Sequence, residues 1–414
     1  MNEKNKHRFE IIVGVIGNAL VWYNFALFMP FLPIISKEFF PIEDPFWRTN
    51  VSFLVMAVGL LVRPLGSAIF GPIGDKIGRQ KAISMSILLM AIPTFLMGFI
   101  PNYKTIGIWS PILLILCRAL QGISLGGEYT AAMVNFVEKA PGNRRGFYGS
   151  WSEIGSQIGV LLAAHALVSL HSFFSEAEVY EYGWRFAFFG AIALLPFAFL
   201  VHEEEKPKKE QPHSKEPIFS MLLHHKKEVI STFFITAFSA LGFYTLLTFL
   251  PSYLVEKNML SIKEASMCSV AANFALIISA FICGYLSDIF KRKGFLAIGM
   301  IGVTIVVYFM FLMDVRDYSQ WLIIQILYGW FIGMYYSCRA AFFSEAFPKS
   351  VRCTGVSVSL SLAQAIFGGS ASNIMNFCVS SSGFVAVIPT TIITAIALYC
   401  LTLIEDRTGK ELRE

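Results

Sequence analysis

The stretch that decides the fold runs from residue 63 to residue 81 and reads RPLGSAIFGPIGDKIGRQK. Its first half is apolar enough to end a membrane helix. Its second half places four charged side chains within seven residues: Asp75, Lys76, Arg79 and Lys81. The glycines at 71, 74 and 78 allow close helix packing and a positive φ where the chain reverses direction. The stretch therefore predicts a short charged turn at a membrane surface, between two spans.

The composition of the whole chain places it in a lipid bilayer. It has 414 residues, of which 55% are hydrophobic and only 15% charged, and its mean hydropathy is +0.61. A soluble domain of this length carries more charge. We therefore predict an all-α membrane protein whose partner is the lipid bilayer and not nucleic acid.

The reactive side chains do not form a recognisable catalytic or metal-binding set. The seven cysteines stand singly, mostly within apolar runs, without the spacing of a zinc or redox site. No nucleophile and base stand in a known arrangement, and no phosphate-binding glycine loop is present. The sequence predicts neither an enzyme nor a protein with a metal or other cofactor.

Apolar segments long enough to cross the membrane recur twelve times. A helix needs about 20 apolar residues to cross a hydrocarbon core of roughly 30 Å. The segments are residues 11–36, 47–70, 82–101, 108–137, 146–170, 184–202, 228–254, 265–287, 294–313, 319–346, 353–377 and 384–404. The first is longer than the apolar core of a signal peptide, roughly 7–15 residues, so we expect an uncleaved span.

Lysine and arginine predict the orientation. Of these 33 residues, 23 fall on the side of the N-terminus and 7 on the opposite side, including Arg48 and Arg185 at the outer ends of their spans, and 3 lie deeper within spans. Positive charge gathers on the cytoplasmic side of membrane proteins. We therefore expect a multi-pass protein of a bacterial-type inner membrane with both termini in the cytoplasm.

The longest hydrophilic stretch divides the spans six and six. Residues 203–227 contain three consecutive glutamates, several lysines and three prolines, which is typical of a linker or of a solvated charged loop. The predicted domains are a six-helix bundle over residues 1–202, a cytoplasmic linker over 203–227 and a second six-helix bundle over 228–414.

An internal repeat supports this division. The first repeated pattern occupies Gly71 to Arg79 and, 213 residues later, Gly284 to Arg292. The second pattern recurs 207 residues later. Its residues Glu138, Pro141 and Arg145 correspond in order to Glu345, Pro348 and Arg352. Two similar offsets at matching places indicate two homologous halves related by an axis along the membrane normal.

These motifs resemble those of the major facilitator superfamily. The opening stretch matches its loop signature, G-x-x-x-D-[RK]-x-G-R-x-[RK]. Narrower motifs are similar to those of the metabolite:proton symporters, the group of proline/betaine and α-ketoglutarate carriers: Arg63-Pro64-Leu65-Gly66, the run from Arg118 to Glu128, Gly183-Trp184-Arg185 and the run from Leu250 to Leu254. The resemblance implies a major facilitator fold of two six-helix halves with twelve transmembrane helices. It does not name the solute.

The first span departs from the subfamily pattern. The subfamily carries G-N-x-x-E-W-Y-D-F, whereas this chain reads GNALVWYNF from Gly17 to Phe25. Val21 and Asn24 therefore stand where the resemblance expects acids. Proton coupling through this span is accordingly in question.

Several residues within the spans are expected to contact the solute. Arg118 lies near mid-membrane, where an ionisable side chain is costly, and its planar guanidinium suits a carboxylate. A structural ion pair with an acid on another span is the alternative. Aromatic faces bind quaternary ammonium groups. The further expected solute contacts are Trp22, Tyr23, Asn24 and Tyr335.

Two acids within the spans are candidates for proton coupling. Glu128 follows two glycines that let a neighbouring helix approach, and burial there favours its protonated form. Permanent pairing with Arg63 or with another cation of the inner half is the alternative for Glu128. Glu153 either compensates for the missing acids of the first span or faces a cytoplasmic vestibule.

The repeated loop residues have a different expected role. In the family, the aspartate of this loop and nearby cations hold the two halves together on the cytoplasmic side. The resemblance carries this gating role to five residues: Arg63, Asp75, Arg79, Asp288 and Arg292. Asp75 is expected to accept hydrogen bonds from the free N–H groups of the helix that follows Pro348.

The function that this sequence predicts is import of a small organic zwitterion or carboxylate with protons, by a monomeric secondary active transporter that works by alternating access. A facilitator or exchanger without proton coupling is one alternative, because Val21 and Asn24 replace acids. A membrane sensor that binds a ligand without moving it is another.

Overall fold

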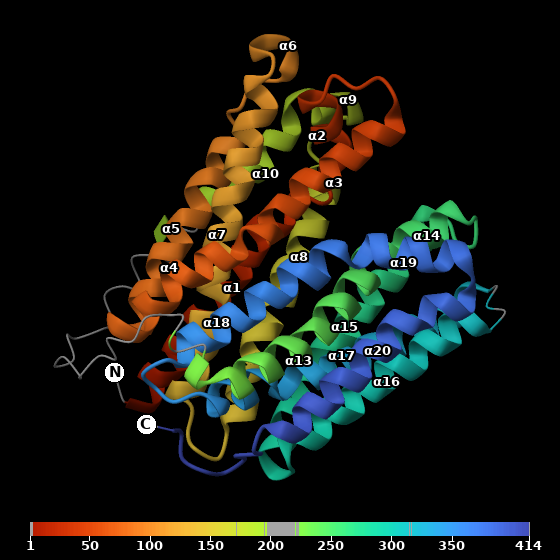
Figure 1. The fold of residues 1–414 in the computed structure, drawn as a ribbon. Coiled ribbons are helices and arrows are strands. Elements are labelled where there is room, and N and C mark those ends of the chain that lie inside the picture. Colours follow the sequence, from red (N-terminus) through yellow and green to blue (C-terminus); the bar gives the residue numbers. More distant parts are fainter. Residues whose placement is uncertain are drawn as a thin grey trace. The chain divides into compact units, whose positions relative to one another are not determined.

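The structure is a computed structural model, and it forms helices and turns, without strands, over the residues that it describes. These are residues 3–170, 172–193, 195, 196, 220, 223–313, 315 and 317–413. The chain divides into two compact units, whose helices are labelled in Figure 1. Unit 1 comprises Met1–Ala132 and Gly155–His213, and unit 2 comprises Met133–Ile154 and Ser214–Glu414.

Unit 1 consists of long helices joined by short turns. Its described helices are α1 (Glu3–Ala26), α2 (Leu32–Phe39), α3 (Pro45–Leu61), α4 (Arg63–Lys76), α5 (Arg79–Met97), α6 (Tyr103–Ile106), most of α7 (Trp109–Lys139), the later part of α8 (Arg145–Leu170), α9 (Glu176–Glu178) and α10 (Trp184–Phe189). Helix α5 packs against α1, α4 and α10. The end of α7 and the start of α8 belong to unit 2.

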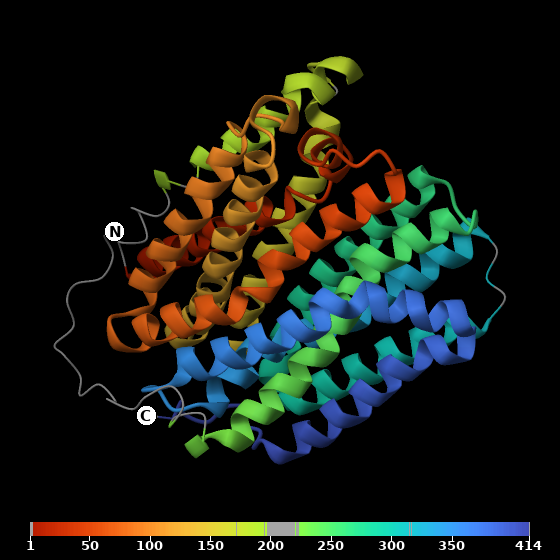
Figure 2. The same cartoon turned by 45° about the horizontal axis from the view of Figure 1, so that its top comes forward.

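Unit 2 contains the second set of long helices. Its further described helices are α13 (Lys226–Tyr244), α14 (Leu250–Glu256), α15 (Ile262–Ile289), α16 (Arg292–Leu312), α17 (Tyr318–Ala346), α18 (Arg352–Ala363), α19 (Gly369–Ser381) and α20 (Gly383–Leu403). Helix α17 packs against α15 and α16, and α20 packs against α13 and α16, as Figure 2 also shows.

Eight helical stretches among the described residues are long and apolar enough to cross a membrane. They are Leu54–Lys76, Arg79–Met97, Trp109–Lys139, Arg145–Leu170, Lys263–Ile289, Arg292–Leu312, Tyr318–Ala346 and Gly383–Leu403. Ile11–Ala26 is a shorter apolar helix in the first predicted span. The eight stretches agree with eight of the twelve predicted spans.

Some predicted spans are not continuous α-helices. The span predicted over 11–36 breaks between α1 and α2, where turns surround Pro30. The span predicted over 47–70 changes from α3 to α4 at Val62, directly before an Arg-Pro pair. Each break lies close to a proline. Because proline has no N–H to donate, it interrupts a helix in its interior and is tolerated in the first turn.

Two spans of unit 2 contain a wider helical turn. A π-helical turn, Thr245–Phe249, separates α13 from α14, and another, Gln364–Gly368, separates α18 from α19. The first comes shortly before Pro251. Such turns occur often at functional sites and bend the helices that contain them.

The charged turn of the opening stretch is very short. Helix α4 ends at Lys76 and α5 begins at Arg79, so only two residues separate them. Gly78 has a φ of 137°, which a residue with a side chain rarely adopts. The predicted turn is therefore confirmed, and the glycine at 78 is the one that its backbone requires.

The predicted linker, residues 203–227, lies largely outside the described residues. The division into 1–202, 203–227 and 228–414 therefore stays a prediction. The residues Met133–Ile154 group with unit 2. They include the loop of the second repeated pattern, from Glu138 to Arg145, which places that loop among the helices of the later part of the chain.

Candidate functional site

Glycines bring α4 and α7 of unit 1 into backbone contact. A Cβ atom added at Gly126 would lie 2.2 Å from the carbonyl oxygen of Arg63, and one at Gly66 would lie 1.9 Å from that of Ile123. The Ser67 hydroxyl donates to the Gly126 carbonyl at 3.1 Å. The close approach predicted from the glycines before Glu128 is therefore confirmed.

Glu128 lies on α7 directly beyond this crossing. Its side chain is 1% exposed, and its Oε2 atom has no hydrogen-bond partner among the described residues. Arg63 is near enough to interact with it electrostatically. Keeping a carboxylate charged at such a place is costly, whereas the neutral acid can remain buried. The site is therefore suited to taking up and releasing a proton.

Arg118 is buried in the interior of unit 1. Its guanidinium lies 4.6 Å from the Phe25 ring centre and 4.7 Å from that of Phe28. It donates to the Phe25 carbonyl at 3.2 Å and to the Gln121 amide oxygen at 2.7 Å. Since only 1% of Arg118 is exposed, these contacts hold α1 against α7. Direct solute binding by Arg118 stays a prediction.

The residues of α1 expected to bind solute offer polar atoms. The Trp22 ring lies edge-on to Tyr129 at 5.6 Å, and the indole N–H has no partner among the described residues. The Asn24 side-chain amide donates to the Leu20 carbonyl, while its side-chain oxygen has no hydrogen-bond partner among the described residues. Tyr23 is half-buried and donates to the Ala187 carbonyl at 3.4 Å.

Tyr335 belongs to unit 2. Its hydroxyl donates to the Ile235 carbonyl at 2.8 Å, and its ring lies edge-on to Phe238 at 5.3 Å. The side chain is fully buried. These contacts join α17 to α13, so Tyr335 has a packing role here, and its expected solute contact stays a prediction.

Glu153 pairs with an arginine that the sequence analysis did not select. Arg339 Nη2 on α17 lies 3.2 Å from Glu153 Oε2 on α8, and both side chains are buried. The Arg339 guanidinium also lies 4.5 Å from the centre of the Tyr336 ring. Arg339 was one of three arginines within the predicted spans, and that rarity was the available signal.

The two copies of the loop motif form ion pairs at helix ends. In unit 1, Arg79 pairs with Asp75 at 2.5 Å. In unit 2, Arg292 pairs with Asp288 at 2.9 Å, and Asp288 also accepts hydrogen bonds from the N–H groups of Gly146 and Phe147 at 2.7 and 2.8 Å. Asp288 therefore caps the start of α8, as Asp75 was expected to cap the helix after Pro348.

The second repeated pattern supplies the remaining partners. Arg292 donates to both carboxylate oxygens of Glu345, at 2.8 and 2.6 Å, and Arg145 lies 3.4 Å from Glu345. Arg352 pairs with Glu138 at 2.5 Å. In the sequence these residues indicated a repeat and not a site. Glutamate and arginine at matching places in both copies were the signal that they form ion pairs.

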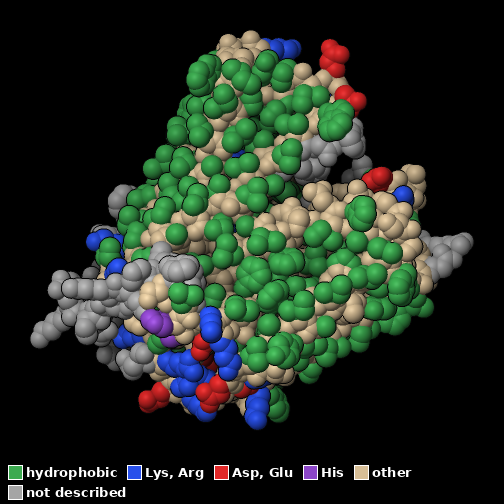
Figure 3. All heavy atoms as spheres, in the orientation of Figure 1, with side chains coloured by type: hydrophobic (Ala, Val, Ile, Leu, Met, Phe, Trp, Pro, Cys, Tyr) green, Lys and Arg blue, Asp and Glu red, His purple; other side chains and the backbone are tan. Residues whose placement is uncertain are grey.

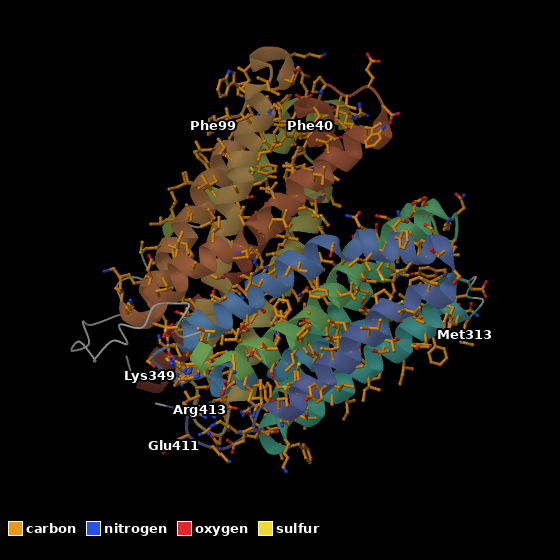
Figure 4. The ribbon with its side chains drawn as sticks, in the orientation of Figure 1. Phe40, Phe99, Met313, Lys349, Glu411 and Arg413 are labelled. Atoms are coloured by element: carbon orange, nitrogen blue, oxygen red, sulfur yellow. The ribbon has the colours of Figure 1, made fainter. Side chains whose placement is uncertain are left out.

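The residues after α20 cover this charged cluster. The carbonyl of Lys410 accepts from Arg145 at 2.6 Å, and that of Arg413 accepts from Arg352 at 2.7 Å. The N–H of Lys293 donates to Asp406 at 3.2 Å. Figure 4 labels Lys349 and Arg413 at this end of unit 2, where charged side chains gather in Figure 3.

The fold and these sites define a polytopic membrane carrier rather than an enzyme. Its long apolar helices bury arginines and glutamates at intramembrane positions, with further ion pairs at the helix ends. The chain matches the Major Facilitator Superfamily over residues 14–259 and 232–414. It belongs to that family, and the predicted fold class is confirmed.

Two named transporters are similar in sequence to most of the chain. The chain is 30% identical over 387 residues to the proline/betaine transporter of Escherichia coli (strain K12), covering 88% of this chain and 77% of that one. It is 31% identical over 377 residues to the glycine betaine/proline/ectoine/pipecolic acid transporter OusA of Dickeya dadantii (strain 3937), with coverages of 86% and 75%. The predicted resemblance to the proline/betaine group is thereby confirmed.

Solved structures show the same fold. The proton:xylose symporter XylE bound to 6-bromo-6-deoxy-D-glucose matches with a TM-score of 0.81 at 16% identity, covering 99% of this chain and 98% of that chain. The partially occluded inward-open xylose transporter XylE from E. coli matches with a TM-score of 0.74 at 18% identity, with coverages of 98% and 100%. At these identities the likeness concerns the fold alone.

Proposed function

We propose that this membrane transporter imports a small organic zwitterion or carboxylate together with protons, by alternating access. The similarity to proline/betaine transporters over most of the chain supports the solute class. We further propose a monomer in a bacterial-type inner membrane. The lysine and arginine distribution supports the placement of both termini in the cytoplasm.

Glu128 is the observation that carries the proton-coupling part of the proposal. One oxygen of this buried carboxyl has no hydrogen-bond partner within the described ranges, so little holds the carboxylate in its charged form and a proton can neutralise it. Arg63 nearby supplies a positive charge that stabilises the carboxylate once the proton leaves. The two opposed influences suit an acid that alternates between charge states.

For solute binding in unit 1, we propose that the α1 residues act together with Arg118. The indole N–H of Trp22 and the amide oxygen of Asn24 are buried and have no hydrogen-bond partner in the described part of the chain. They offer a donor and an acceptor two residues apart. Arg118 binds the Phe25 carbonyl, so it holds this segment of α1 in position.

For the gate, we propose that the loop ion pairs open and close as the transporter changes state. Asp75 with Arg79 and Asp288 with Arg292 lie at helix ends, where a moving helix breaks or makes their contacts. Arg63 at the start of α4 contributes through the α4–α7 contact.

Uptake into proteoliposomes tests the proposed function. Purified full-length protein is reconstituted, and accumulation of radiolabelled glycine betaine and proline is followed with and without an imposed pH gradient, inside alkaline. We expect accumulation above equilibrium only with the gradient, and its loss when a protonophore is added. Uptake of neither compound by protein that is correctly folded contradicts the proposed solutes.

A facilitator or exchanger without proton coupling is a second candidate. It is favoured by Val21 and Asn24, which replace both acids of the subfamily motif in the first span. Both residues are buried, and Asn24 donates to the Leu20 carbonyl, a contact that needs no charge. In the same experiment this candidate predicts equilibration of the solute at a rate that the pH gradient does not change.

A further inference from the structure

The ion pair between Glu153 and Arg339 lies inside the helices and not at their ends. Glu153 is eight residues from the start of α8, and Arg339 is seven residues from the end of α17. At about 1.5 Å per residue, each lies roughly 10–12 Å along its helix from the charged cluster. The contact between Arg145 and Glu345 shows that these two helix termini are at the same end of unit 2.

A gain in stability does not explain why an ion pair is buried at this depth. Glu153 is 5% exposed and Arg339 2% exposed, so both charges have lost most of their solvation. Replacing a buried ion pair by apolar residues is often neutral or stabilising, because desolvation offsets the attraction. Ionisable residues at membrane depth are for this reason usually functional.

An aromatic ring completes the arrangement. The Tyr336 ring faces the Arg339 guanidinium at 4.5 Å, and the edge contact with Phe243, 6.2 Å between ring centres, helps to hold the ring. The face of such a ring attracts any cation, and quaternary ammonium groups are favoured ligands. The site therefore combines one anion, one cation and one cation-binding surface within unit 2.

We propose that Glu153, Arg339 and Tyr336 form a binding site for a zwitterionic solute in unit 2, in addition to the solute contacts proposed for unit 1, and that the solute enters it by exchanging with the ion pair. The carboxylate of the solute takes the place of Glu153 on Arg339. Its ammonium group takes the place of Arg339, against Glu153 and over Tyr336. This inference rests on the proposed function and narrows it, because a zwitterion leaves every charge in the site compensated.

Solutes with a single charge do not satisfy this site. A carboxylate alone would occupy Arg339 and leave Glu153 without a counter-charge, and a cation alone would leave Arg339 uncompensated. An uncompensated buried charge is strongly unfavourable. The arrangement therefore selects short zwitterions over anions and cations of the same shape.

Binding of three probes of nearly equal shape tests the inference. Glycine betaine, 3,3-dimethylbutanoate, which has carbon in place of the quaternary nitrogen, and choline are titrated into purified full-length protein by calorimetry. We expect the wild type to bind glycine betaine at least about tenfold more tightly than either other probe. Arg339→Gln should weaken glycine betaine binding by at least about tenfold, whereas Glu153→Gln should remove most of the preference over 3,3-dimethylbutanoate.

Further variants separate binding from folding. Glu153→Gln/Arg339→Gln removes both charges together, and this variant should fold and bind glycine betaine at least about tenfold more weakly than wild type. Arg339→Lys and Glu153→Asp keep the charges and should weaken binding less. Arg185→Gln removes a unit 1 arginine that donates to the Gly98 and Ile100 carbonyls, and should leave the preference unchanged.

Three results would overturn the inference. Glycine betaine binding by folded Arg339→Gln, or by the double variant, within twofold of wild type would exclude the site while leaving the proposed function intact. An unchanged preference in folded Glu153→Gln would do the same. Absence of binding of all three probes by the wild type would instead contradict the proposed function, and the inference with it.

Discussion

Glu128 and Glu153 are both intramembrane glutamates on consecutive long helices, yet their surroundings differ. Glu128 in unit 1 lies beyond a glycine-mediated helix contact, and its Oε2 has no hydrogen-bond partner among the described residues. Glu153 in unit 2 lies 3.2 Å from the Arg339 guanidinium. Glu128 can lose its charge without breaking a hydrogen bond to Oε2, whereas Glu153 is part of a close charge pair.

On the basis of this difference we propose separate tasks for two acids that the sequence placed in one class. A carboxyl without a fixed partner is suited to carry a proton. A carboxyl in an ion pair is suited to respond to another charged molecule. Changes to each acid, or to the packing around it, test whether this distinction holds.

Removal of the Glu128 charge should have the largest effect on transport. Glu128→Gln keeps the shape of the side chain but cannot exchange a proton. We expect complete loss of accumulation driven by a pH gradient in proteoliposomes, with retention of exchange between labelled and unlabelled glycine betaine. Undiminished gradient-driven accumulation would assign proton coupling elsewhere and remove the distinction between the two acids.

Removal of the Glu153 charge should have the largest effect on stability. Glu153→Ala leaves Arg339 buried without its counter-charge, which costs about 3–5 kcal/mol in comparable buried pairs. Glu128→Gln should change stability less, since the amide keeps the shape of the side chain and Oε2 has no hydrogen-bond partner among the described residues to lose. Thermal unfolding of both variants in the same detergent compares them directly, and equal losses would contradict the contrast.

Separation of α4 from α7 should disturb the Glu128 site moderately. Gly126→Ala places a Cβ atom 2.2 Å from a backbone oxygen of Arg63, so the helices must move apart. Overpacking of this kind costs about 1–3 kcal/mol. We expect a lower unfolding temperature and weakened proton coupling.

Gly294→Ala is the matched control, because a Cβ atom there meets nothing within 4 Å. It lies near the start of α16. An equal loss of stability in both variants would show that the contact at Gly126 has no special importance.

The smallest effect on stability is expected from a change at Asp406, a hydrogen-bonded carboxyl outside the membrane spans. Burial raises its pKa, but hydrogen bonds from Thr408 and from the Lys293 N–H outweigh this and leave the pKa below its ordinary value. Its stabilisation is therefore complete above the ordinary aspartate pKa, about 4, and is lost as the pH falls through the lower folded-state pKa.

The measurement is the unfolding temperature of wild type and Asp406→Asn between about pH 7 and pH 3. We expect a small deficit of the variant at neutral pH that shrinks as the pH falls below about 4. A deficit that does not depend on pH would show that the Asp406 charge contributes nothing.

The sequence by itself determined the fold class. The evidence for it is local: hydrophobic runs, the charged turn that contains Gly78, and the repeat of that turn at Gly284 to Arg292. Such patterns can be recognised without knowing how the helices pack against one another. The same reasoning selected Glu128, because two adjacent glycines in an apolar helix indicate close contact with a neighbouring helix.

Only the tertiary structure decided which charges meet. Arg339 and Glu153 are 186 residues apart, and the partners of Glu345, Arg145 and Arg292, come from two different loops. Spacing along one helix says which face a residue occupies but not which side chain of another helix lies opposite. Because the free energy of a buried charge depends on that opposite group, the roles of the two glutamates became distinguishable only in the folded chain.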